Sequence, residues 1–251
     1  MPEPQRCLSV VIPAYNEEAT IAHVVGQVLK LAVVVEVIVV NDCSKDRTAD
    51  IVRQLAVSDS RVHLLEHKVN RGKTEALKTG FAQVRGEIVI VQDADLEYDP
   101  VEIPDVIQPI LNGKADVVYG SRFLVRKASR VLYFYHFLAN KLLTFTSNLF
   151  TNINLTDVET GYKAFRAEIM RNMVITSSGF GFEIEVTAKV AKLGCAIYEV
   201  PISYYGRTYE QGKKIGPWDG VAAFWYIVKY NLFCSLRSSY VKLPALESRP
   251  A

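Results

Sequence analysis

The sequence predicts an α/β protein built around a mostly parallel sheet with helices on both faces. Up to about residue 95, short apolar runs alternate with segments of helical character, which is the pattern of repeated strand–helix units. Three of the apolar runs are followed by polar segments, at residues 15–17, 41–46 and 93–97. Because the carboxyl ends of parallel strands meet at one edge of a sheet, we expect these segments to form a single ligand site.

The expected elements follow from apolar runs and the breaks between them. Strands are expected at residues 8–12, 33–40, 62–66, 87–91, 116–120 and 196–202. Helices are expected after polar or glycine-containing breaks, at residues 18–31, 47–55, 74–84 and 179–193. Glu17 and Glu18 are expected in the first turn of the first helix, where the helix dipole favours acids. Ser44 or Asp46 is suited to cap the second helix.

Composition and missing motifs disfavour several classes of protein. The 251 residues carry a net charge of +2, so the overall charge does not indicate a nucleic-acid partner. The four cysteines form no C-x-x-C pair, which is typical of reduced thiols in a cytosolic protein. The N-terminus has no apolar signal segment, and no window of about 20 residues predicts a spanning helix. Neither G-x-G-x-x-G nor a Walker motif is present, which disfavours dinucleotide dehydrogenases and ATPases.

Asp93 and Asp95 are the candidate metal ligands. They follow the apolar strand at residues 87–91 and, one residue apart on an extended chain, point to the same side. Two hard oxygen ligands at the open edge of a parallel sheet suit Mg²⁺ or Mn²⁺ carrying a diphosphate. A strand that ends in solvated acids would show the same Asp-x-Asp pattern, so the metal interpretation depends on the rest of the chain.

The second half of the chain contains a basic and aromatic segment. Four basic residues follow one another without an intervening acid, namely Arg122, Arg126, Lys127 and Arg130. Residues 131–145 are rich in aromatic side chains, and one or two amphipathic helices are expected there. Such helices either pack on the core or lie with a basic edge on an anionic membrane.

Two later segments leave alternatives open. Residues 204–215 are polar, basic and glycine-containing, which suits either a mobile lid over phosphates or a solvated surface loop. The apolar tail at residues 221–241 either packs on the domain, dimerises or lies in a bilayer interface.

Several short segments together resemble family 2 glycosyltransferases of the GT-A fold. The first half contributes Val11-Ile-Pro-Ala-Tyr-Asn-Glu17, Val40-Asn-Asp-Cys-Ser-Lys-Asp46, Asn70-Arg-Gly-Lys73 and Asp93-Ala-Asp95. The later segments Gly120-Ser-Arg122, 157–165 and 207–214 are similar to the branch that contains dolichyl-phosphate mannose and glucose synthases. The resemblance covers about residues 8–230 and is specific through the order and spacing of its segments. The Q-x-x-R-W motif of processive polysaccharide synthases is absent.

The resemblance implies a role for each matching residue. A nucleotide sugar would be bound by Pro13, Ala14, Tyr15, Glu17, Asp42, Lys73, Asp93 and Ala94, with Tyr15 near the base. A Mg²⁺ or Mn²⁺ ion bridging the diphosphate would be held by Asp93, Asp95 and Glu97. Phosphate and acceptor groups would be bound by Arg122, Arg126, Arg130, Arg207, Lys213 and Lys214. The catalytic residues would be Asp95, Arg122, Asp157 and Arg207.

The implied reaction is an inverting transfer of a hexose to a polyprenyl or dolichyl phosphate from a donor of the GDP-mannose or UDP-glucose type. The metal and the cations would stabilise the leaving diphosphate. A lipid phosphate is already an anion at neutral pH, so no strong general base is needed, and none of the four histidines lies in a matching motif. A hydroxyl acceptor would instead require a carboxylate base. Asp157 is then the best candidate, followed by Glu183 and Glu185.

Two function classes other than glycosyl transfer are also compatible with an α/β fold of this kind. A metal-dependent nucleotidyltransferase would use a related sheet and release pyrophosphate, but its usual Gly-rich N-terminal loop is missing. A non-catalytic membrane scaffold would keep the fold, although the intact residues Asp93, Asp95, Arg122 and Arg207 argue against it.

One catalytic domain is expected over residues 1–230, with a nucleotide-sugar half at 8–120 and an acceptor half at 121–220. Residues 221–251 are expected to form an amphipathic helix and tail. Because no spanning helix is predicted, we expect a cytoplasmic protein that is peripheral on the cytosolic face of a membrane. Its partners would be a nucleotide sugar, a polyprenyl phosphate lipid, and a separate membrane protein or a second copy of the chain.

Overall fold

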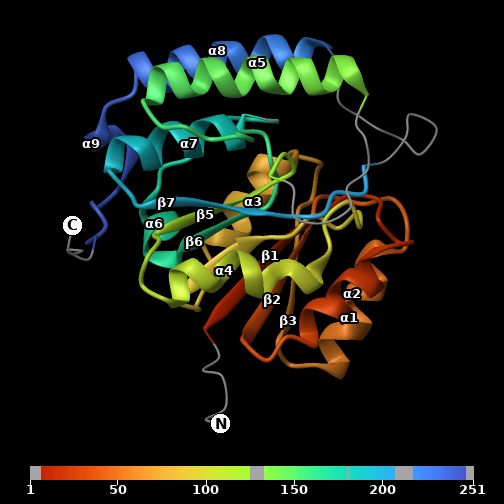
Figure 1. Ribbon diagram of the computed structural model, residues 1–251. Helices are drawn as coiled ribbons and strands as arrows, with labels where there is room; N and C mark the ends of the chain where they lie inside the picture. The colour runs from red at the N-terminus through yellow and green to blue at the C-terminus, as the bar shows by residue number, and fades with distance from the viewer. Residues whose placement is uncertain (1–6, 125–132, 180, 207–216, 247–251) are drawn as a thin grey trace.

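A seven-stranded sheet forms the centre of the molecule, with the strand order β3-β2-β1-β4-β6-β5-β7 (Figure 1). The computed structural model describes residues 7–124, 133–179, 181–206 and 217–246, the first three residues of the last range by their backbone only. The strands are β1 (Leu8–Ala14), β2 (Val34–Asn41), β3 (Val62–Glu66), β4 (Ile88–Val91), β5 (Val117–Ser121), β6 (Lys163–Arg166) and β7 (Ile197–Pro201).

Helices cover both faces of this sheet. They are α1 (Ile21–Leu29), α2 (Thr48–Ser58), α3 (Lys73–Phe81), the 3₁₀ helix η1 (Pro100–Glu102), α4 (Ile103–Leu111), α5 (Phe134–Thr151), α6 (Ala167–Asn172), α7 (Phe182–Leu193), α8 (Pro217–Leu232) and α9 (Leu236–Ser239). The expected α/β architecture, a mostly parallel sheet flanked by helices, is confirmed.

The direction of each strand decides which residues reach the functional edge. β1 pairs in parallel with β2 and β4, β2 with β3, and β5 with β7. β6 is antiparallel to both of its neighbours, β4 and β5. The parallel strands therefore end at one edge of the sheet, as expected. Because β6 runs the other way, the residues that precede it, 157–162, lie at that same edge.

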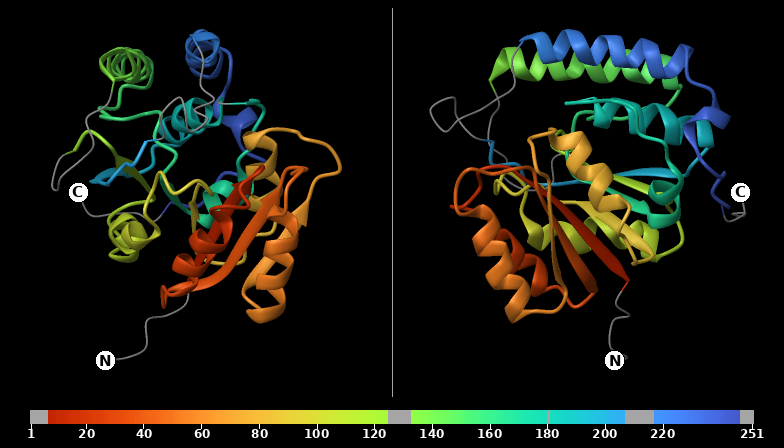
Figure 2. Two further views of the ribbon diagram at one scale, coloured as in Figure 1. Left: turned by 90° about the vertical axis from the view of Figure 1, so that its right-hand side faces the viewer. Right: turned by 180° about the vertical axis from the view of Figure 1, so that it is seen from behind.

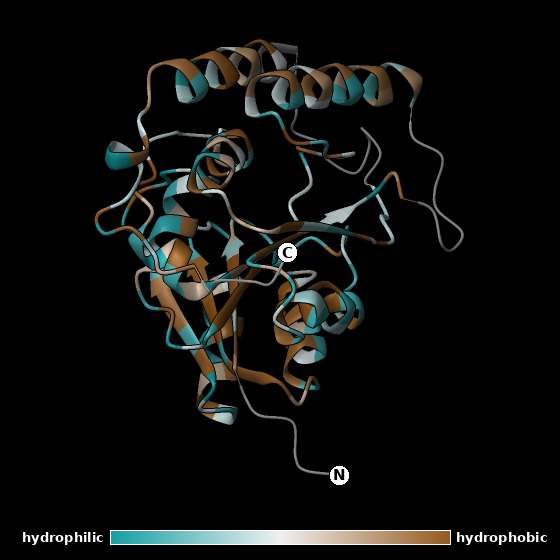
Figure 3. Ribbon diagram, turned by 60° about the vertical axis from the view of Figure 1, so that its left-hand side comes forward, coloured by the Kyte–Doolittle hydropathy of each residue, from teal (hydrophilic) through white to brown (hydrophobic). Residues whose placement is uncertain are grey.

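The hydrophobic core lies on both faces of the sheet. Along β1, Val10 and Ile12 face one cluster of buried residues and Val11 faces the other, because side chains alternate along a strand. The first cluster is closed by α1, α2 and α4, and the second by α3, α6 and α7. The strands are predominantly hydrophobic, as expected for strands covered on both sides (Figure 3).

Several short elements were not predicted, among them α4, β6 and α6. α4 contains Pro104 in its first turn and Pro109 inside the helix, and proline usually breaks a helix. Pro104 is tolerated because the first N–H groups of a helix have no intrahelical partner. β6 has only four residues, Lys163 to Arg166, and its basic ends hide the apolar pattern of a strand.

The expected start of the first helix was wrong. α1 begins at Ile21, so Glu17 and Glu18 precede the helix and its first turn contains no acid. Their backbone N–H groups bond to side chains of the next loop instead, Glu17 to Thr48 and Glu18 to Asp46. Asp46 also accepts the N–H of Thr48 at the start of α2, although Arg47 occupies the cap position.

Helices α5 and α8 lie side by side over α7, on the side away from the sheet (Figures 1 and 2). Leu143 of α5 and Ala223 and Ile227 of α8 are buried in the second core cluster. The inner sides of both helices therefore pack on the domain. Within the described residues, no helix combines the length and apolar character needed to cross a bilayer.

Candidate active site

The loops after β1 and β2 are joined by hydrogen bonds. The Asn16 N–H donates to Ser44 Oγ over 2.9 Å, and Asn16 Oδ1 accepts the Lys45 N–H over 2.8 Å. Asn16 and Cys43 have left-handed φ angles of 55° and 60°, and Leu96 after β4 has a φ of 61°. Such backbone is unfavourable for non-glycine residues and is concentrated at functional sites. All three residues follow strands that end at the same edge of the sheet.

Asp42 anchors the start of α3. Its carboxylate accepts the backbone N–H groups of Arg71 over 2.9 Å and Gly72 over 2.6 Å, and lies 2.7 Å from a ring nitrogen of His67. The other ring nitrogen of His67 lies 2.9 Å from the Thr79 hydroxyl. His67 is thus a structural residue, in line with the sequence expectation. The Asp42 carboxylate thus already accepts hydrogen bonds within the protein. Its role in binding the base and ribose of a nucleotide stays a prediction.

Asp93 lies in a tight polar cluster. Lys73 Nζ is 2.9 Å from Asp93 Oδ1 and 3.4 Å from Glu183 Oε1. Burial opposes the charge on Lys73, but the two carboxylates outweigh it and raise the pKa of the lysine. A Cβ atom on Gly161 would lie only 2.6 Å from Asp93 Oδ2, so a side chain here would displace either the carboxylate or the backbone. The Gly161 N–H donates to the Tyr98 hydroxyl over 3.0 Å.

Asp95 and Glu97 lie on the turn that follows. The Glu97 N–H donates to Asp95 Oδ1 over 3.1 Å, and the Tyr204 hydroxyl donates to Glu97 Oε2 over 2.9 Å. No group of three His, Cys, Asp or Glu side chains among the described residues forms a ready-made metal site. Mg²⁺ is commonly held by one or two carboxylates together with substrate phosphates. The hard oxygens of Asp95 and Glu97 fit that mode. The metal-binding role of Asp93, Asp95 and Glu97 stays a prediction.

Arg122 and Asp157 form a buried ion pair. Arg122 Nε and Nη2 each donate to one Asp157 oxygen over 2.7 Å, and the Arg122 backbone N–H donates to the same carboxylate. The Asp157 side chain is fully buried and that of Arg122 is 12% exposed. Burial opposes the charge of Arg122, but Asp157 and neighbouring groups raise its pKa well above the usual value. Two residues predicted to act separately are thus paired with each other.

Further charged groups surround this pair. Burial, then the nearby Glu183, raises the pKa of Glu159 to about 7. Burial lowers the pKa of Lys163 to about 8, and its ammonium group donates to the carbonyls of Val158 and Thr160. Sequence reasoning assigned no role to Glu159 or Lys163. Both lie in the matching segment 157–165, but only the reversed direction of β6 brings that segment to the site.

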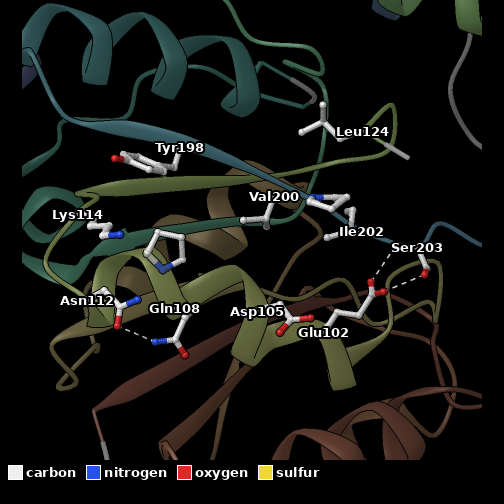
Figure 4. A pocket seen from close by; sticks show the side chains of 12 residues that line it. Glu102, Asp105, Gln108, Asn112, Lys114, Leu124, Tyr198, Val200, Ile202 and Ser203 are labelled. Carbon is white, nitrogen blue, oxygen red and sulfur yellow. Dashed lines mark hydrogen bonds between the residues drawn. The ribbon is translucent and has the colours of Figure 1, made fainter. Parts of the chain in front are cut away.

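The remaining predicted residues fall into three groups. Pro13 and Ala14 end β1, Tyr15 and Glu17 follow it half-buried, and Ala94 is buried beside Asp93. Glu185, a candidate base, is fully buried in an ion pair with Lys189. Arg126, Arg130, Arg207, Lys213 and Lys214 lie outside the described residues. A separate groove of about 430 Å³ between α4 and β7 includes none of the predicted site residues (Figure 4).

The comparison with known families decides the identity of the fold and the class of enzyme. Residues 9–174 match the family model described as glycosyl transferase family 2. The chain belongs to this family. Members of glycosyl transferase family 2 are glycosyltransferases, and this chain is therefore an enzyme of that class.

Several curated relatives in this family are named for transfer to a polyprenyl phosphate. The undecaprenyl-phosphate mannosyltransferase of Micrococcus luteus is 32% identical over 82% of this chain and 86% of its own. The polyprenol monophosphomannose synthase of Mycolicibacterium smegmatis is 30% identical over 84% of this chain and 82% of its own. The dolichol-phosphate mannosyltransferase of Pyrococcus furiosus is 28% identical over 83% of this chain and 59% of its own.

Solved structures support the fold of this glycosyltransferase. The glucosyl-3-phosphoglycerate synthase of Mycobacterium tuberculosis with UDP superimposes with a TM-score of 0.69 and 24% identity, over 90% of this chain and 80% of that one. The same synthase with Mn²⁺, UDP and its product gives a TM-score of 0.66 at 23% identity. At this identity the similarity establishes the architecture alone.

Proposed function

We propose that this glycosyltransferase transfers a hexose, with inversion, from a nucleotide sugar to a polyprenyl phosphate at the cytosolic face of a membrane. Mg²⁺ or Mn²⁺ would be its cofactor. The names of the relatives from three organisms support a polyprenyl phosphate acceptor and make mannose the first hexose to test. The neighbouring synthase structures that contain Mn²⁺ or Mg²⁺ with UDP support the use of a divalent ion.

The Arg122–Asp157 pair is the observation that carries this proposal. A hydroxyl acceptor needs a carboxylate that can take its proton, and the best candidate in the sequence is Asp157. Both oxygens of Asp157 accept hydrogen bonds from the Arg122 guanidinium, and the side chain is fully buried. A carboxylate held in this way is poorly suited to reach an incoming hydroxyl. A phosphate acceptor requires no such base.

Each residue of the site would then have a separate role in binding or catalysis. When bound, the divalent ion would offset the negative charge that develops on the leaving diphosphate. Asp95 and Glu97 would hold it through carboxylate oxygens, while Lys73 orients Asp93 at 2.9 Å. Arg122 has five N–H groups, and those that do not bond to Asp157 would donate to the acceptor phosphate.

A sugar-transfer assay tests the reaction. The protein is mixed with Mn²⁺ or Mg²⁺, a short polyprenyl phosphate, and GDP-mannose, UDP-glucose or UDP-N-acetylglucosamine in separate reactions. We expect a glycolipid from one donor, no product with a chelator, and at least about a 100-fold loss in Asp95→Asn. Asp105→Asn, an equivalent change at an exposed position on α4, serves as the matched control. Release of nucleotide without glycolipid would move the acceptor to a hydroxyl and refute the phosphate proposal.

The outer face of α5 and α8 supports the membrane part of the proposal. On α5 the exposed residues Phe134, Leu138, Leu142, Phe145 and Leu149 recur every three or four positions and form one stripe. Val221, Trp225 and Leu232 are exposed on α8, which lies beside it (Figure 2). Most exposed large apolar side chains of the described residues belong to these two helices or adjoin them. A continuous apolar surface of this kind marks an interaction site.

Charge favours an anionic bilayer over a second protein copy as the occupant of this face. Residues 121–156 contain no acidic residue, so α5 and the segment before it carry only basic charges. Two like-charged faces would repel each other, whereas anionic headgroups attract basic side chains by about 1 kcal/mol each near the surface. Aromatic and leucine side chains on one helix face are typical of interfacial helices.

Sedimentation with lipid vesicles tests this face directly. Wild-type protein should bind vesicles that contain phosphatidylglycerol more tightly than neutral phosphatidylcholine vesicles. The double variant Phe145→Ser/Leu149→Ser should lose at least about ten-fold in binding, because it removes two apolar side chains from the bilayer contact. Val57→Ser, which removes an exposed apolar side chain from α2, should bind like wild type. A concentration-dependent dimer that the double variant abolishes, without vesicle binding, would assign the face to a second copy instead.

A further inference from the structure

Tyr204 follows β7 and connects two parts of the candidate active site. Its hydroxyl donates to Glu97 Oε2 over 2.9 Å. The guanidinium carbon of Arg122 lies 5.1 Å from the centre of its ring. The ring also packs against Tyr98, with the two ring centres 5.4 Å apart. One side chain therefore contacts a candidate metal ligand and a candidate phosphate-binding residue, although no motif in the sequence assigns it a role.

The backbone around Tyr204 is fastened to the segment that follows β4. The Tyr205 N–H donates to the carbonyl of Glu97 over 2.9 Å. Ser203 donates to the Glu102 carboxylate through both its N–H and its hydroxyl, each over 2.8 Å (Figure 4). These bonds fix the chain on both sides of Tyr204. The phenol therefore reaches Glu97 from a fixed backbone position.

The Tyr204 hydroxyl is a constant donor at neutral pH. A tyrosine phenol ordinarily has a pKa of about 10, so it keeps its proton at neutral pH. A hydrogen bond from a permanent donor restricts the rotation of the carboxylate that accepts it. Such bonds to metal-binding side chains orient the ligand and typically change metal affinity by 10- to 100-fold when they are removed.

We propose that Tyr204 is a positioning residue that orients Glu97 toward the metal and Arg122 toward the acceptor phosphate. The proposal rests on the proposed function, from which Glu97 and Arg122 take their roles. The two ends of the side chain act separately. The hydroxyl orients Glu97, and the ring supports the Arg122 guanidinium through a cation–π contact in a largely buried setting.

Removing the hydroxyl alone tests the first role. Tyr204→Phe keeps the ring and should weaken Mn²⁺ binding about ten-fold. Binding is measured by electron paramagnetic resonance of free Mn²⁺, with GDP or UDP present and without any acceptor. Tyr205→Phe is the matched control, because the same atom is removed from the neighbouring tyrosine, whose side chain is exposed. Excess Mn²⁺ should restore the transfer rate of Tyr204→Phe.

Removing the ring tests the second role. Tyr204→Leu should lose Mn²⁺ affinity to the same extent and should also raise the KM for polyprenyl phosphate about ten-fold relative to Tyr204→Phe. Excess Mn²⁺ should not correct this KM, because the lost contact is to Arg122 and not to the metal ligand. Thermal unfolding of each variant checks that the fold is retained.

A double variant separates positioning from packing. Glu97→Gln should weaken Mn²⁺ binding, and Tyr204→Phe added to it should cause little further loss, because the hydroxyl acts through Glu97. Wild-type Mn²⁺ affinity in Tyr204→Phe, or losses that simply add in the double variant, would overturn the proposal. Since Mn²⁺ binding is measured without an acceptor, a protein that makes no glycolipid can still support or refute the role of Tyr204 toward Glu97.

Discussion

At the scale of single residues, Gly161 shows how closely the chain is packed around Asp93. Its backbone lies where a side chain would touch the Asp93 carboxylate, and its N–H bonds to Tyr98. Lys73 Nζ lies 2.9 Å from Oδ1 and 3.2 Å from Oδ2 of the same carboxylate. Asp93 is therefore confined by its neighbours to one position, which is the arrangement expected of a preorganised site.

Gly161→Ala should disturb this position. The added Cβ would lie 2.6 Å from Asp93 Oδ2, so either the carboxylate or the backbone must move. We expect a loss of about 1–3 kcal/mol in the free energy of unfolding and roughly 100-fold in transfer rate. Gly26→Ala in α1 is the control, because a Cβ there meets nothing within 4 Å. It should gain about 0.5–1 kcal/mol and keep full activity. Normal activity in Gly161→Ala would show that Asp93 is not tightly confined.

Glu159 should make stability depend on pH. Its pKa is raised from 4.5 to about 7 by burial and by Glu183, so between these values the folded protein keeps a proton that the unfolded chain releases. The free energy of unfolding should therefore fall as pH rises through this range, by at most about 3 kcal/mol. Glu159→Gln does not titrate and should flatten the profile measured by urea unfolding. Glu87→Gln, at an exposed position, should leave it unchanged. If the free energy of unfolding still falls with rising pH in Glu159→Gln, a different titrating group causes the fall.

At the scale of elements, β6 and α7 bring polar groups into the interior. β6 carries the buried Lys163 into the sheet, and α7 carries Glu185 and Lys189 as a buried pair one helical turn apart. Glu185 also accepts the N–H groups of Thr176 and Ser177, which lie before α7. The pair therefore fixes the segment that leads into the helix as well as the helix itself.

Lys189→Met should destabilise α7 strongly. It leaves the buried Glu185 carboxylate without its cation, and breaking a buried pair costs about 3–5 kcal/mol. Lys78→Met breaks a surface pair with Glu75 on α3 and should cost less than about 1 kcal/mol. Both values are measured by denaturant unfolding. Equal costs for the two variants would contradict the structural role of the buried pair.

At the scale of the whole molecule, the candidate site is assembled from distant parts of the chain. The loops after β1, β2 and β4, the start of α3, the segment before β6 and the residues after β7 all meet at one edge of the sheet. Such a site is completed by its ligands, because the described residues contain no ready-made group of three metal-binding side chains. The diphosphate and the ion should therefore depend on each other for binding.

Thermal unfolding should reveal this dependence. A nucleoside diphosphate with Mn²⁺ should raise the melting temperature, by the equivalent of about 2.7 kcal/mol at 100 times the dissociation constant. The nucleotide alone or Mn²⁺ alone should have a much smaller effect, and a chelator should reverse the shift. Asp95→Asn should abolish it, whereas Asp105→Asn should not. Full stabilisation by the nucleotide in the presence of chelator would argue against a metal-bridged diphosphate.

The fold class and the family were predictable from local sequence patterns and are confirmed, and the same patterns predicted a candidate site at the carboxyl edge of the sheet. These depend on local patterns, since apolar runs form strands and the polar residues that end parallel strands must meet. Metal and nucleotide roles followed from motifs of a few adjacent residues, and they remain predictions.

Only the tertiary structure decided which side chains are partners. The pairing of Arg122 with Asp157 joins residues 35 positions apart, and it depends on the reversal of β6, which a four-residue strand does not reveal. The bond from Tyr204 to Glu97 spans 107 positions. The amphipathic pattern of α5 likewise left open whether its apolar residues face the core or the outside, because that depends on what covers each face. Contacts of this kind arise from packing between elements, and no local sequence pattern contains them.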